Sequence, residues 1–468
     1  MRSPIATALG LVLALPLALL GLSSMTATNS RAATPEIRLP APEVEMLPNG
    51  LEVIWFQNDK LPLVDLALVL KSGSRDDPAG KSGMTELLAK VLDRGPEIEA
   101  LGAFHYTAPD EEFFTLGLHG LAPDAPVLLK LLAKMAIHPD LTGPEFNRQH
   151  ASILDHWSHI GDTGESLVSL AFRRQTTAAT PYGRGALVSA EEFRKITPAD
   201  LVNFHKSQFT PKNASLVIVG RADRVALRPQ LLESFGSWTG EAPPRTAKVF
   251  SDKRIPPAKT GQVLIVNRPE LNQTQVRIGF RAPKFNHPDQ YALAVINALF
   301  GEYFDSRLNS VIRDKLGLTY AIGSNFSYNR ELGIFSIAAA TRNVTTGPLI
   351  RKVLDALKSL RTAPIGDQEI ETAKEYLMGG FPLGTATLGA IASRWTVGHV
   401  MGLDPDFLNQ FVPKIHALTR IEIEAALKKH FNPDLIYVVV AGDAKQIKAS
   451  LAGQGGFSSR VVSQKDLF

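Results

Sequence analysis

Hydrophobic residues recur along the chain with the spacing of a helix in some segments and of a strand in others. The clearest helical pattern covers residues 81–94, where the apolar positions form one stripe of Met84, Leu87, Leu88, Val91 and Leu92. This spacing predicts a helix with one buried face, and Gly95 supplies a C-terminal stop. Glu86 and Lys90 on this helix have the spacing and order of a favourable helical ion pair.

A longer pattern occurs twice in the chain. Residues 196–220 and 418–442 align without a gap at a constant offset of 222 positions. The alignment superimposes identical residues: Phe209 on Phe431, Pro211 on Pro433 and Gly220 on Gly442. Each copy predicts a helix, a turn that contains proline and an apolar strand that ends at glycine. The chain therefore contains an internal duplication.

A pair of helix-start signals supports the duplication. Asp76-Asp77-Pro78 and Asn286-His287-Pro288 each lie between a strand-like segment and an amphipathic helix. Asp or Asn followed closely by proline is typical of the beginning of a helix. These signals predict that each half begins with strands and continues with helices.

The repeat and the prolines predict the domain boundaries. Pro243-Pro244 and Pro256-Pro257 bracket a polar stretch that favours neither a helix nor a central strand. We expect a first domain at 43–242, a linker at 243–261, a second domain at 262–450 and a mobile tail at 451–468. Consecutive strands near the start of each half favour hairpins over a doubly wound sheet. The expected fold is α+β, with two tandem homologous domains that each carry a mixed, mostly antiparallel sheet and helices on one face.

Composition excludes several classes of function. The chain of 468 residues has a formal net charge of only +4, and no Lys/Arg run exceeds a pair, so nucleic-acid binding has no electrostatic basis. It has no cysteine, which excludes disulfides, thiolate zinc ligands and a thiol nucleophile. The G-x-S-x-G, H-E-x-x-H and dinucleotide-binding motifs do not occur.

The N-terminus has the organisation of an export signal. Arg2 precedes a largely apolar stretch at 5–22, which is followed by small and polar residues up to position 33. This order predicts a secretory signal peptide over residues 1–33 and a periplasmic or otherwise exported protein. An uncleaved membrane anchor is the alternative, because the stretch is close to the minimum length for spanning a bilayer. The chain has no second long apolar run, so we expect no stable membrane insertion after signal removal.

Five short strings occur in order along the first half: residues 47–51 (LPNGL), 73–76 (GSRD), 81–83 (KSG), 181–183 (PYG) and 196–197 (IT). On these strings the chain resembles the pitrilysin and mitochondrial-processing-peptidase family of zinc peptidases. In catalytic members, the helix that follows the Lys-x-Gly string carries an inverted H-x-x-E-H motif with two zinc-binding histidines and a glutamate base. Here these positions hold Glu86, Ala89 and Lys90. The resemblance therefore implies that this chain holds no metal at that helix, because none of the three residues is an imidazole and Lys90 would repel a cation.

A separate group of histidines could hold a metal in principle. The family's third zinc ligand falls near Asp155 or His156, and His150 and His159 lie on the same segment. Histidines at i and i+3 on a helix can share a metal ion. Exposed histidines on a polar helix are the commoner explanation, and we favour it.

The second half retains the other part of the family's active site. Residues 304–324 (FDSRLNSVIRDKLGLTYAIGS) are similar to the segment in which an active-site Arg lies on a helix and a Tyr on the next strand. The resemblance assigns these roles to Arg313 and Tyr320. A tyrosine hydroxyl can donate to the oxygen that becomes negative as water attacks a peptide carbonyl, and an arginine can fix the substrate backbone. The sequence pattern alone would also allow Tyr320 to be a core strand residue that alternates with Leu318 and Ile322.

Family members that carry only one of the two motifs typically work in pairs. The resemblance implies that this chain is the subunit without zinc in a heterodimeric zinc endopeptidase, inactive alone, with Arg313 and Tyr320 completing the partner's active site. The partner would be a homologous subunit that carries H-x-x-E-H and the zinc, and the substrates would be unfolded peptides bound by strand pairing. The alternatives are a non-catalytic structural subunit and a stand-alone peptide-binding protein.

Overall fold

The computed structural model describes residues 38–93, 95–159, 162–177, 180–186, 189–244, 261–432 and 435–467, and Leu39–Phe468 form one compact unit. The expected signal peptide at 1–33 lies outside the described residues, as do positions 245–260 of the expected linker. Among the helices that the structure describes, none has the length and apolarity needed to cross a bilayer. We call residues 39–244 the first half and residues 261–467 the second half.

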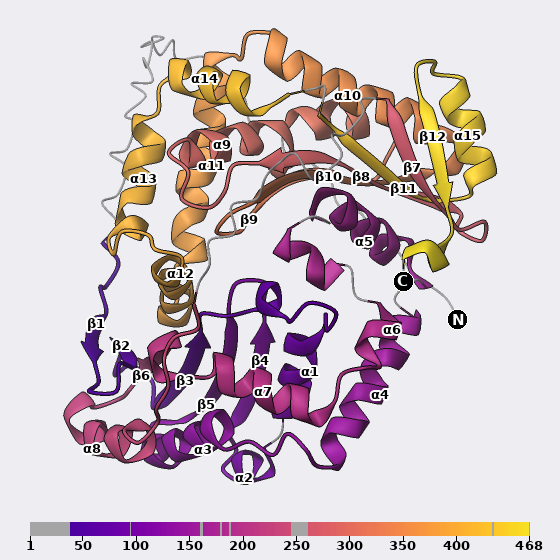
Figure 1. Cartoon of the computed structure of the whole chain (residues 1–468). Coiled ribbons are helices and arrows are strands. Elements are labelled where there is room, and N and C mark those ends of the chain that lie inside the picture. The colour runs from indigo at the N-terminus through magenta and orange to yellow at the C-terminus, as the bar shows by residue number, and fades with distance from the viewer. Residues whose placement is uncertain are drawn as a thin grey trace, which may run out of the picture. The chain divides into compact units, whose positions relative to one another are not determined.

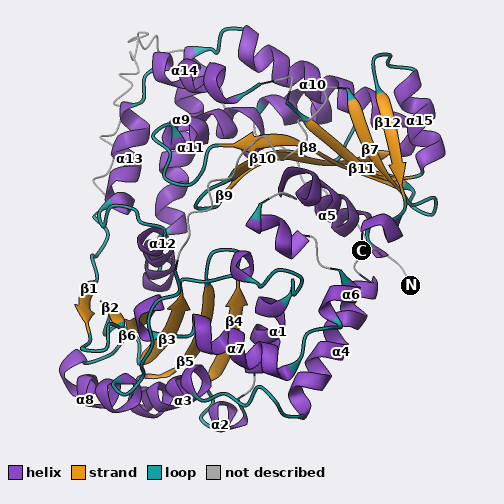
Figure 2. Cartoon of the chain, viewed as in Figure 1, coloured by secondary structure: helices purple, strands orange, loops and turns teal. Residues whose placement is uncertain are grey.

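Each half contains one six-stranded sheet (Figures 1 and 2). The sheet of the first half has, in spatial order, β1 (Glu43–Met46), β2 (Glu52–Gln57), β6 (Ala214–Gly220), β3 (Leu63–Leu70), β5 (Phe114–Leu121) and β4 (Phe104–Pro109). The sheet of the second half has β12 (Ser458–Val462), β7 (Gln262–Asn267), β11 (Tyr437–Gly442), β8 (Gln273–Ala282), β10 (Gly333–Arg342) and β9 (Ile322–Tyr328).

Five strands of each sheet repeat the same topology, whereas the added edge strand is antiparallel in the first sheet (β1) and parallel in the second (β12). In each, the first long strand pairs parallel with the last strand of the repeat, β2 with β6 and β7 with β11. The other central pairs, β6–β3–β5–β4 and β11–β8–β10–β9, are antiparallel. The predicted α+β class, with two homologous, mostly antiparallel mixed sheets, is confirmed.

The repeated helix–turn–strand unit is built from the same local interactions in both halves. Helix α7 (Pro198–Gln208) begins with a capping box of Thr197 and Asp200, and α14 (Arg420–His430) begins with one of Thr419 and Glu422. In each box, the threonine hydroxyl accepts a hydrogen bond from the backbone N–H of the acidic residue, and the carboxylate of that residue accepts one from the threonine backbone N–H. Both helices end at the aligned phenylalanines, whose backbone N–H groups bond to carbonyls of the last turn.

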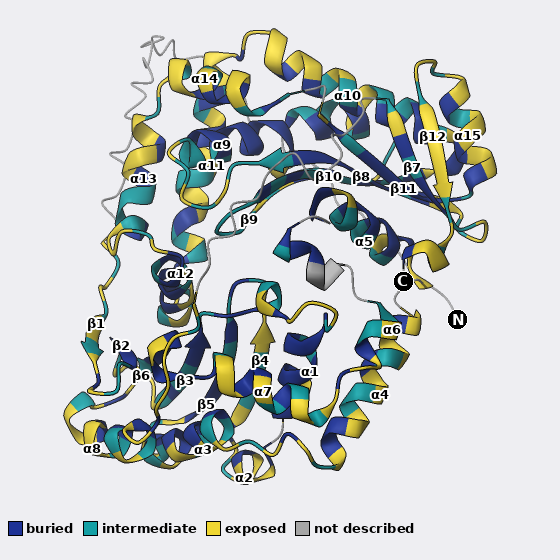
Figure 3. Cartoon of the chain, viewed as in Figure 1, coloured by how far each residue is buried: buried dark blue, intermediate teal, exposed yellow. Residues whose placement is uncertain are grey.

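Most helices cover one face of the sheet of their own half. In the first half these are α1 (Met84–Leu92), α2 (Pro96–Glu99), α3 (Ala125–Ile137), α4 (Pro144–His159), α6 (Ala190–Phe193), α7 and α8 (Arg224–Phe235). In the second half they are α9 (Gln290–Asn297), α10 (Thr346–Thr362), α11 (Asp367–Gly384), α13 (Phe407–Ala417), α14 and α15 (Ala444–Ala452). Most residues of the central strands β2, β6, β3, β7, β11 and β8 are buried, as the colouring of Figure 3 shows.

One helix from each half packs against the sheet of the other half. Helix α5 (Gly164–Thr177) of the first half contributes Leu167, Val168, Ala171 and Phe172 to a core that it shares with Val439 and Ala441 of β11. Helix α12 (Leu388–Val400) of the second half packs on β6, and its Trp395 meets Phe56 of β2 edge to face. The 222-residue offset places α5 on residues 386–399, which α12 nearly covers. The exchange is therefore part of the duplication.

The expectation of a mobile tail after residue 450 is wrong. Residues Ser458–Val462 form strand β12, which pairs parallel with β7 at the edge of the second sheet. Gln464–Leu467 form a final helical turn, and Leu467 is buried in the core shared with α5. The segment is polar and carries almost no strand pattern, so its order comes from the unpaired edge of β7 and not from its own propensity.

Candidate active site

Helix α1 is held in place by a buried carboxylate from the preceding turn. Asp77 accepts hydrogen bonds from the backbone N–H groups of Gly83 and Thr85, at 2.8 and 3.0 Å, and from the Thr85 hydroxyl at 2.6 Å. These bonds satisfy N–H groups that the first turn of a helix leaves unpaired. Burial raises the pKa of Asp77 to about 6, although these hydrogen bonds partly oppose the shift. The predicted helix over 81–94 is observed over Met84–Leu92.

The degenerate zinc positions face a cavity of about 500 Å³. Glu86, Ala89 and Lys90 line one side of it, and Thr107 and Pro109 of edge strand β4 line another. Ala89 has no donor atom and Lys90 presents an ammonium group, so the three residues do not fit a zinc ion. Among the described residues, no three metal-ligating side chains converge at this cavity. The structure therefore supports no zinc chemistry at α1.

The helix opposite α1 carries the histidines that were considered as ligands. Burial raises the pKa of the Glu86 carboxyl, and the charges of His156 and Lys90 and a hydrogen bond from Trp157 partly oppose it. His156 thus lies close to Glu86, in the region expected for the family's third ligand. His150 instead stacks between two phenylalanine rings and bonds to the Phe193 carbonyl at 2.9 Å. His159 bonds to the Asp155 carbonyl of its own helix, so the four residues do not form a ligand set.

Arg313 and Tyr320 lie together at the surface of the second half. The guanidinium carbon of Arg313 is 4.2 Å from the centre of the Phe304 ring and 5.7 Å from that of Tyr320. Both distances are within the range of cation–π interactions. Tyr320 is 88% exposed and Phe304 is 64% exposed, so the rings are available to a ligand or a partner.

The backbone between Arg313 and Tyr320 is tightly held even though the side chains are exposed. Arg313 lies on a π-type turn, η8 (Asn309–Lys315), that ends with Gly317 at φ +58°. The Gly317 N–H bonds to the Arg313 carbonyl, and the Leu318 N–H bonds to the Ile312 carbonyl, both at 3.0 Å. Two such backbone hydrogen bonds are typical of a helix C-terminus that is closed by a left-handed glycine. A tight turn after Leu316 therefore separates η8 from the segment that carries Tyr320.

Two threonines fix the segment that carries Tyr320. Thr319 donates its hydroxyl hydrogen to the Ala340 carbonyl at 2.7 Å, and Thr341 donates to the Leu318 carbonyl at 2.6 Å. Both bonds attach the segment to β10. The expectation that Tyr320 lies on a strand is wrong, because β9 begins at Ile322. The interpretation of Tyr320 as a core residue is also wrong, since a core position cannot be 88% exposed.

Two of the family-like sequence strings meet at a charged contact between the halves. Arg75 Nη1 donates to Glu112 at 2.9 Å and to the Tyr182 hydroxyl at 3.1 Å, and the Tyr182 hydroxyl donates to Glu112 at 2.5 Å. From the second half, the backbone N–H of Arg330 donates to Glu112 at 2.9 Å, and Arg75 Nη2 reaches Glu331 at 3.3 Å. Glu112 lies in the β4–β5 turn and Arg330 in the β9–β10 turn, so the two hairpins touch at their tips.

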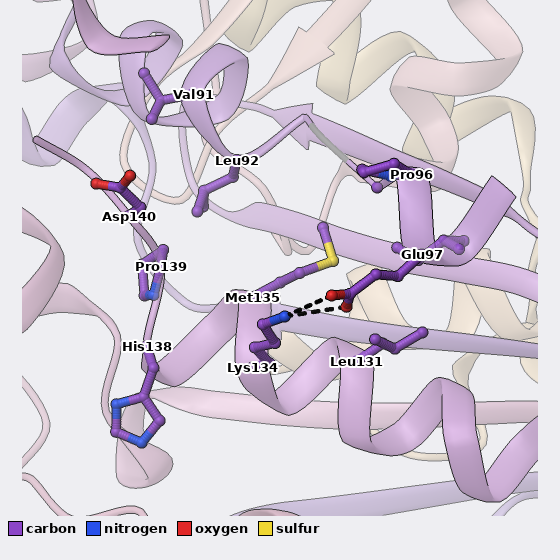
Figure 4. A pocket seen from close by; sticks show the side chains of 12 residues that line it. Val91, Leu92, Pro96, Glu97, Leu131, Lys134, Met135, His138, Pro139 and Asp140 are labelled. Atoms are coloured by element: carbon purple, nitrogen blue, oxygen red, sulfur yellow. Dashed lines mark hydrogen bonds and ion pairs between the residues drawn. The ribbon is translucent and has the colours of Figure 1, made fainter. Parts of the chain in front are cut away.

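Two further cavities flank these features. One of about 420 Å³ lies beside the hairpin contact and is lined by Glu112, Tyr328 and Asn329, among others. Another of about 290 Å³ lies at the end of α1, between α2 and α3 (Figure 4). Figure 4 shows the Lys134 ammonium paired with the Glu97 carboxylate across its mouth, at 3.0 Å. Neither cavity is lined by Arg313, Tyr320 or the degenerate zinc positions.

Comparison with known proteins agrees with this geometry. Residues 195–377 match the family model described as "Peptidase M16 inactive domain". An uncharacterized zinc protease of Mycobacterium tuberculosis is 26% identical over 373 residues, which cover 76% of this chain and 82% of that protein. The zinc protease PqqE of Helicobacter pylori is 25% identical, with 87% of this chain and 95% of that protein covered. The chain is therefore similar to proteins of the peptidase M16 family, and its residues 195–377 match that family's inactive domain.

A solved structure of the same type supports the fold. The peptidase M16 inactive domain from Pseudomonas fluorescens superimposes with a TM-score of 0.78 at 22% identity, covering 86% of this chain and 98% of that chain. The family resemblance inferred from the sequence strings is thereby confirmed. The match to the inactive domain spans Arg313 and Tyr320 and excludes α1.

The sequence pattern gave no sign of two features of this site. Phe304 begins the segment that resembles the family, but nothing in its spacing indicated that it would stack on Arg313. Glu112 was also missed, because it sits in a hairpin turn and has no local pattern. The strings that contain Arg75 and Tyr182 carried the family resemblance, but nothing in them indicated that one carboxylate joins the two residues.

Proposed function

We propose that this chain is the subunit without zinc in a hetero-oligomeric M16 endopeptidase, and that Arg313 and Tyr320 complete the active site of a zinc-carrying partner. The supporting observation is the state of the two half-sites. Arg313 and Tyr320 are packed together on a fixed turn, with Tyr320 88% exposed. The helix that would hold zinc presents Glu86, Ala89 and Lys90.

The chemistry assigned to the pair follows from their groups. The Tyr320 hydroxyl would donate a hydrogen bond to the carbonyl oxygen of the scissile peptide as negative charge develops on it. Arg313 would hold the substrate backbone by donating to peptide carbonyls or to a carboxylate. Neither role needs a metal on this chain, because positioning and electrostatic stabilisation can come from a second polypeptide. The zinc would be held by a homologous partner with H-x-x-E-H.

The proposed substrates are unfolded peptides. Strand β4 is the outer strand of the first sheet, and its residues Thr107 and Pro109 line the cavity beside α1. An exposed sheet edge can bind an extended peptide by adding it as a further strand. The proposed site of action is the periplasm or another exported compartment, as the N-terminal pattern predicts.

Reconstitution tests the proposal. An M16 homologue with H-x-x-E-H, ideally one encoded beside this chain, is co-expressed with it and purified through a tag on only one of the two. We expect a stable complex that hydrolyses an unstructured fluorogenic peptide, whereas this chain alone does not. A complex that forms and is equally active with Arg313 and Tyr320 both replaced by alanine would show that the chain is a structural subunit. Hydrolysis by this chain alone would refute the assignment of the zinc to a partner.

A further inference from the structure

The second half contains a cluster of potential metal ligands that the proposed function does not use. Among the described residues, His287, Asp289 and His430 are the one group of three such side chains whose ligand atoms all lie within 4.8 Å of one another. His430 Nε2 is 2.6 Å from Asp289 Oδ2, and His287 Nδ1 is 3.7 Å from the same oxygen. The two imidazole rings meet edge to face with their centres 5.0 Å apart.

We infer that His287, Asp289 and His430 form a site for a divalent transition-metal ion, bound through two imidazole nitrogens and one carboxylate. This ligand set suits Zn²⁺, Co²⁺ and Ni²⁺. Donor atoms around a four-coordinate ion lie roughly 3.3 Å apart when the metal–ligand distances are about 2.0–2.1 Å. The two separations from Asp289 Oδ2, 2.6 and 3.7 Å, lie on either side of that value, and all three donors lie within 4.8 Å of one another. Three ligands leave a position for water.

Within the part of the chain that the structure describes, the atoms that would bind the metal form hydrogen bonds only with one another and with groups next to them that an ion could replace. Asp289 is the N-cap residue of α9, but its side chain accepts no capping hydrogen bond from that helix. Its carboxylate is directed instead at His430 and at the ammonium group of Lys429, 2.9 Å away. His287 Nδ1 accepts a hydrogen bond from the Asp289 backbone N–H, so the proton of a neutral His287 ring lies on the other nitrogen. A metal ion at Nδ1 would replace that bond.

The burial of the three side chains suits a metal site that solvent can reach. The His430 side chain is 11% exposed, that of His287 23% and that of Asp289 27%. Lys429 is 60% exposed and can turn into solvent. An arriving dication would therefore displace the Lys429 ammonium group, the proton between His430 and Asp289, and the hydrogen bond from the Asp289 N–H to His287.

The internal duplication provides a comparison within the same chain. The paired helix-start signals place His287 opposite Asp77, and the offset of 222 places His430, the last residue of α14, opposite Gln208, the last residue of α7. The first half builds the same helix–turn–strand unit with neither imidazole. The two histidines of the second half are therefore not required by the fold.

The backbone beside the cluster is strained. Among the described residues, Asn286 is the one non-glycine residue with a positive φ, at 58°. Such a conformation is uncommon outside glycine and is often retained at functional sites. Here it directs the next residue, His287, toward the end of α14. The bound ion would join the start of α9 to the end of α14.

Metal titration of the chain alone tests the inference. Untagged protein is freed of metal with a chelator and titrated with Co²⁺ while the visible absorption bands of tetrahedral or five-coordinate cobalt are recorded. We expect one equivalent to bind below about 100 μM and Zn²⁺ to displace it. His287→Ala and His430→Ala should each weaken binding at least tenfold, and His159→Ala, which removes a histidine of α4, should not. No binding below 1 mM, or binding unchanged in both site variants, would overturn the site.

A lysine variant separates a metal site from a simple ion-pair cluster. Lys429→Met removes the ammonium group that competes for Asp289 Oδ2, so we expect it to tighten Co²⁺ binding several-fold while the fold is retained. If Lys429→Met weakens or does not change Co²⁺ binding, the carboxylate is not a ligand and the proposed site is wrong. Because these measurements need no partner and no peptidase activity, their outcome is independent of the proposed function.

Discussion

The guanidinium carbon of Arg313 lies 5.7 Å from the centre of the Tyr320 ring, on a turn whose backbone is bonded to β10. The residues come from a helical turn and the loop that follows it, and Gly317 brings them together by taking a left-handed conformation. Their separation is thus set before any partner or substrate binds. Preorganisation of this kind is what electrostatic stabilisation of a transition state requires.

Removal of the Tyr320 hydroxyl should slow catalysis and leave complex formation intact. In the reconstituted complex, Tyr320→Phe is expected to lower kcat by about 10²–10³-fold with little change in KM, because one donor to a developing oxyanion is lost. The measurement is steady-state hydrolysis of an unstructured peptide. Tyr376→Phe, at the partly exposed tyrosine of α11, is the matched control and should retain full activity. Equal rates for wild type and Tyr320→Phe would refute the assigned role.

Replacement of Arg313 should weaken peptide binding. Arg313→Ala removes charge-assisted hydrogen bonds worth roughly 1.5–3 kcal/mol, so kcat/KM should fall by about 10–100-fold. Arg313→Lys should recover only part of the loss, because an ammonium group cannot donate in a planar fork. Arg148→Ala, at an exposed arginine paired with Glu145, serves as the control. Identical kinetics for the alanine and lysine variants at position 313 would show that the planar donor set is not used.

The buried carboxylate below α1 should make stability depend on pH. Burial raises the pKa of Asp77 in the folded chain to about 6, from its usual value of 3.8. The protonated carboxyl therefore stabilises the folded state fully below pH 3.8, and this stabilisation is lost as the pH rises through 6. The change amounts to roughly 3 kcal/mol. Asp77→Asn should remove this slope from the urea midpoint measured between pH 4 and 6.5. Asp59→Asn, at an exposed position, should leave the slope as it is in wild type; an unchanged slope in Asp77→Asn would contradict the prediction.

The hairpin contact between the halves should depend on one carboxylate. Glu112 is 3% exposed and binds Arg75, Tyr182 and the Arg330 backbone. Glu112 also pairs with the side chain of Arg330, at 3.4 Å. Glu112→Ala therefore leaves the guanidinium groups of Arg75 and Arg330 without this buried carboxylate and should lower the free energy of unfolding by about 3–5 kcal/mol. Glu191→Ala, which removes an exposed ion pair with Lys195, should leave the free energy of unfolding almost unchanged, because water screens exposed pairs. Urea denaturation compares the two, and similar losses would mean that Glu112 makes no special contribution.

Local interactions account for the parts of the fold that were predictable. The apolar stripe from Met84 to Leu92 predicts α1 because burial of one face every 3.6 residues stabilises a helix wherever it packs. The aligned capping boxes at Thr197 and Thr419 begin the same helix in both halves. The loss of the zinc site was also readable, since residue identity alone shows that Ala89 and Lys90 cannot be ligands.

Tertiary packing decided the rest, because the contacts involved join residues far apart in the chain. The sequence by itself determined the duplication, the helix–turn–strand units and the absence of zinc ligands on α1. Only the tertiary structure placed α5 and α12 on each other's sheets, ordered β12 against β7 and brought His287 to His430. Hydrophobic burial is not directional, so an apolar helix face can pack against any apolar surface of fitting shape. Which surface it meets is decided by the arrangement of the whole folded chain.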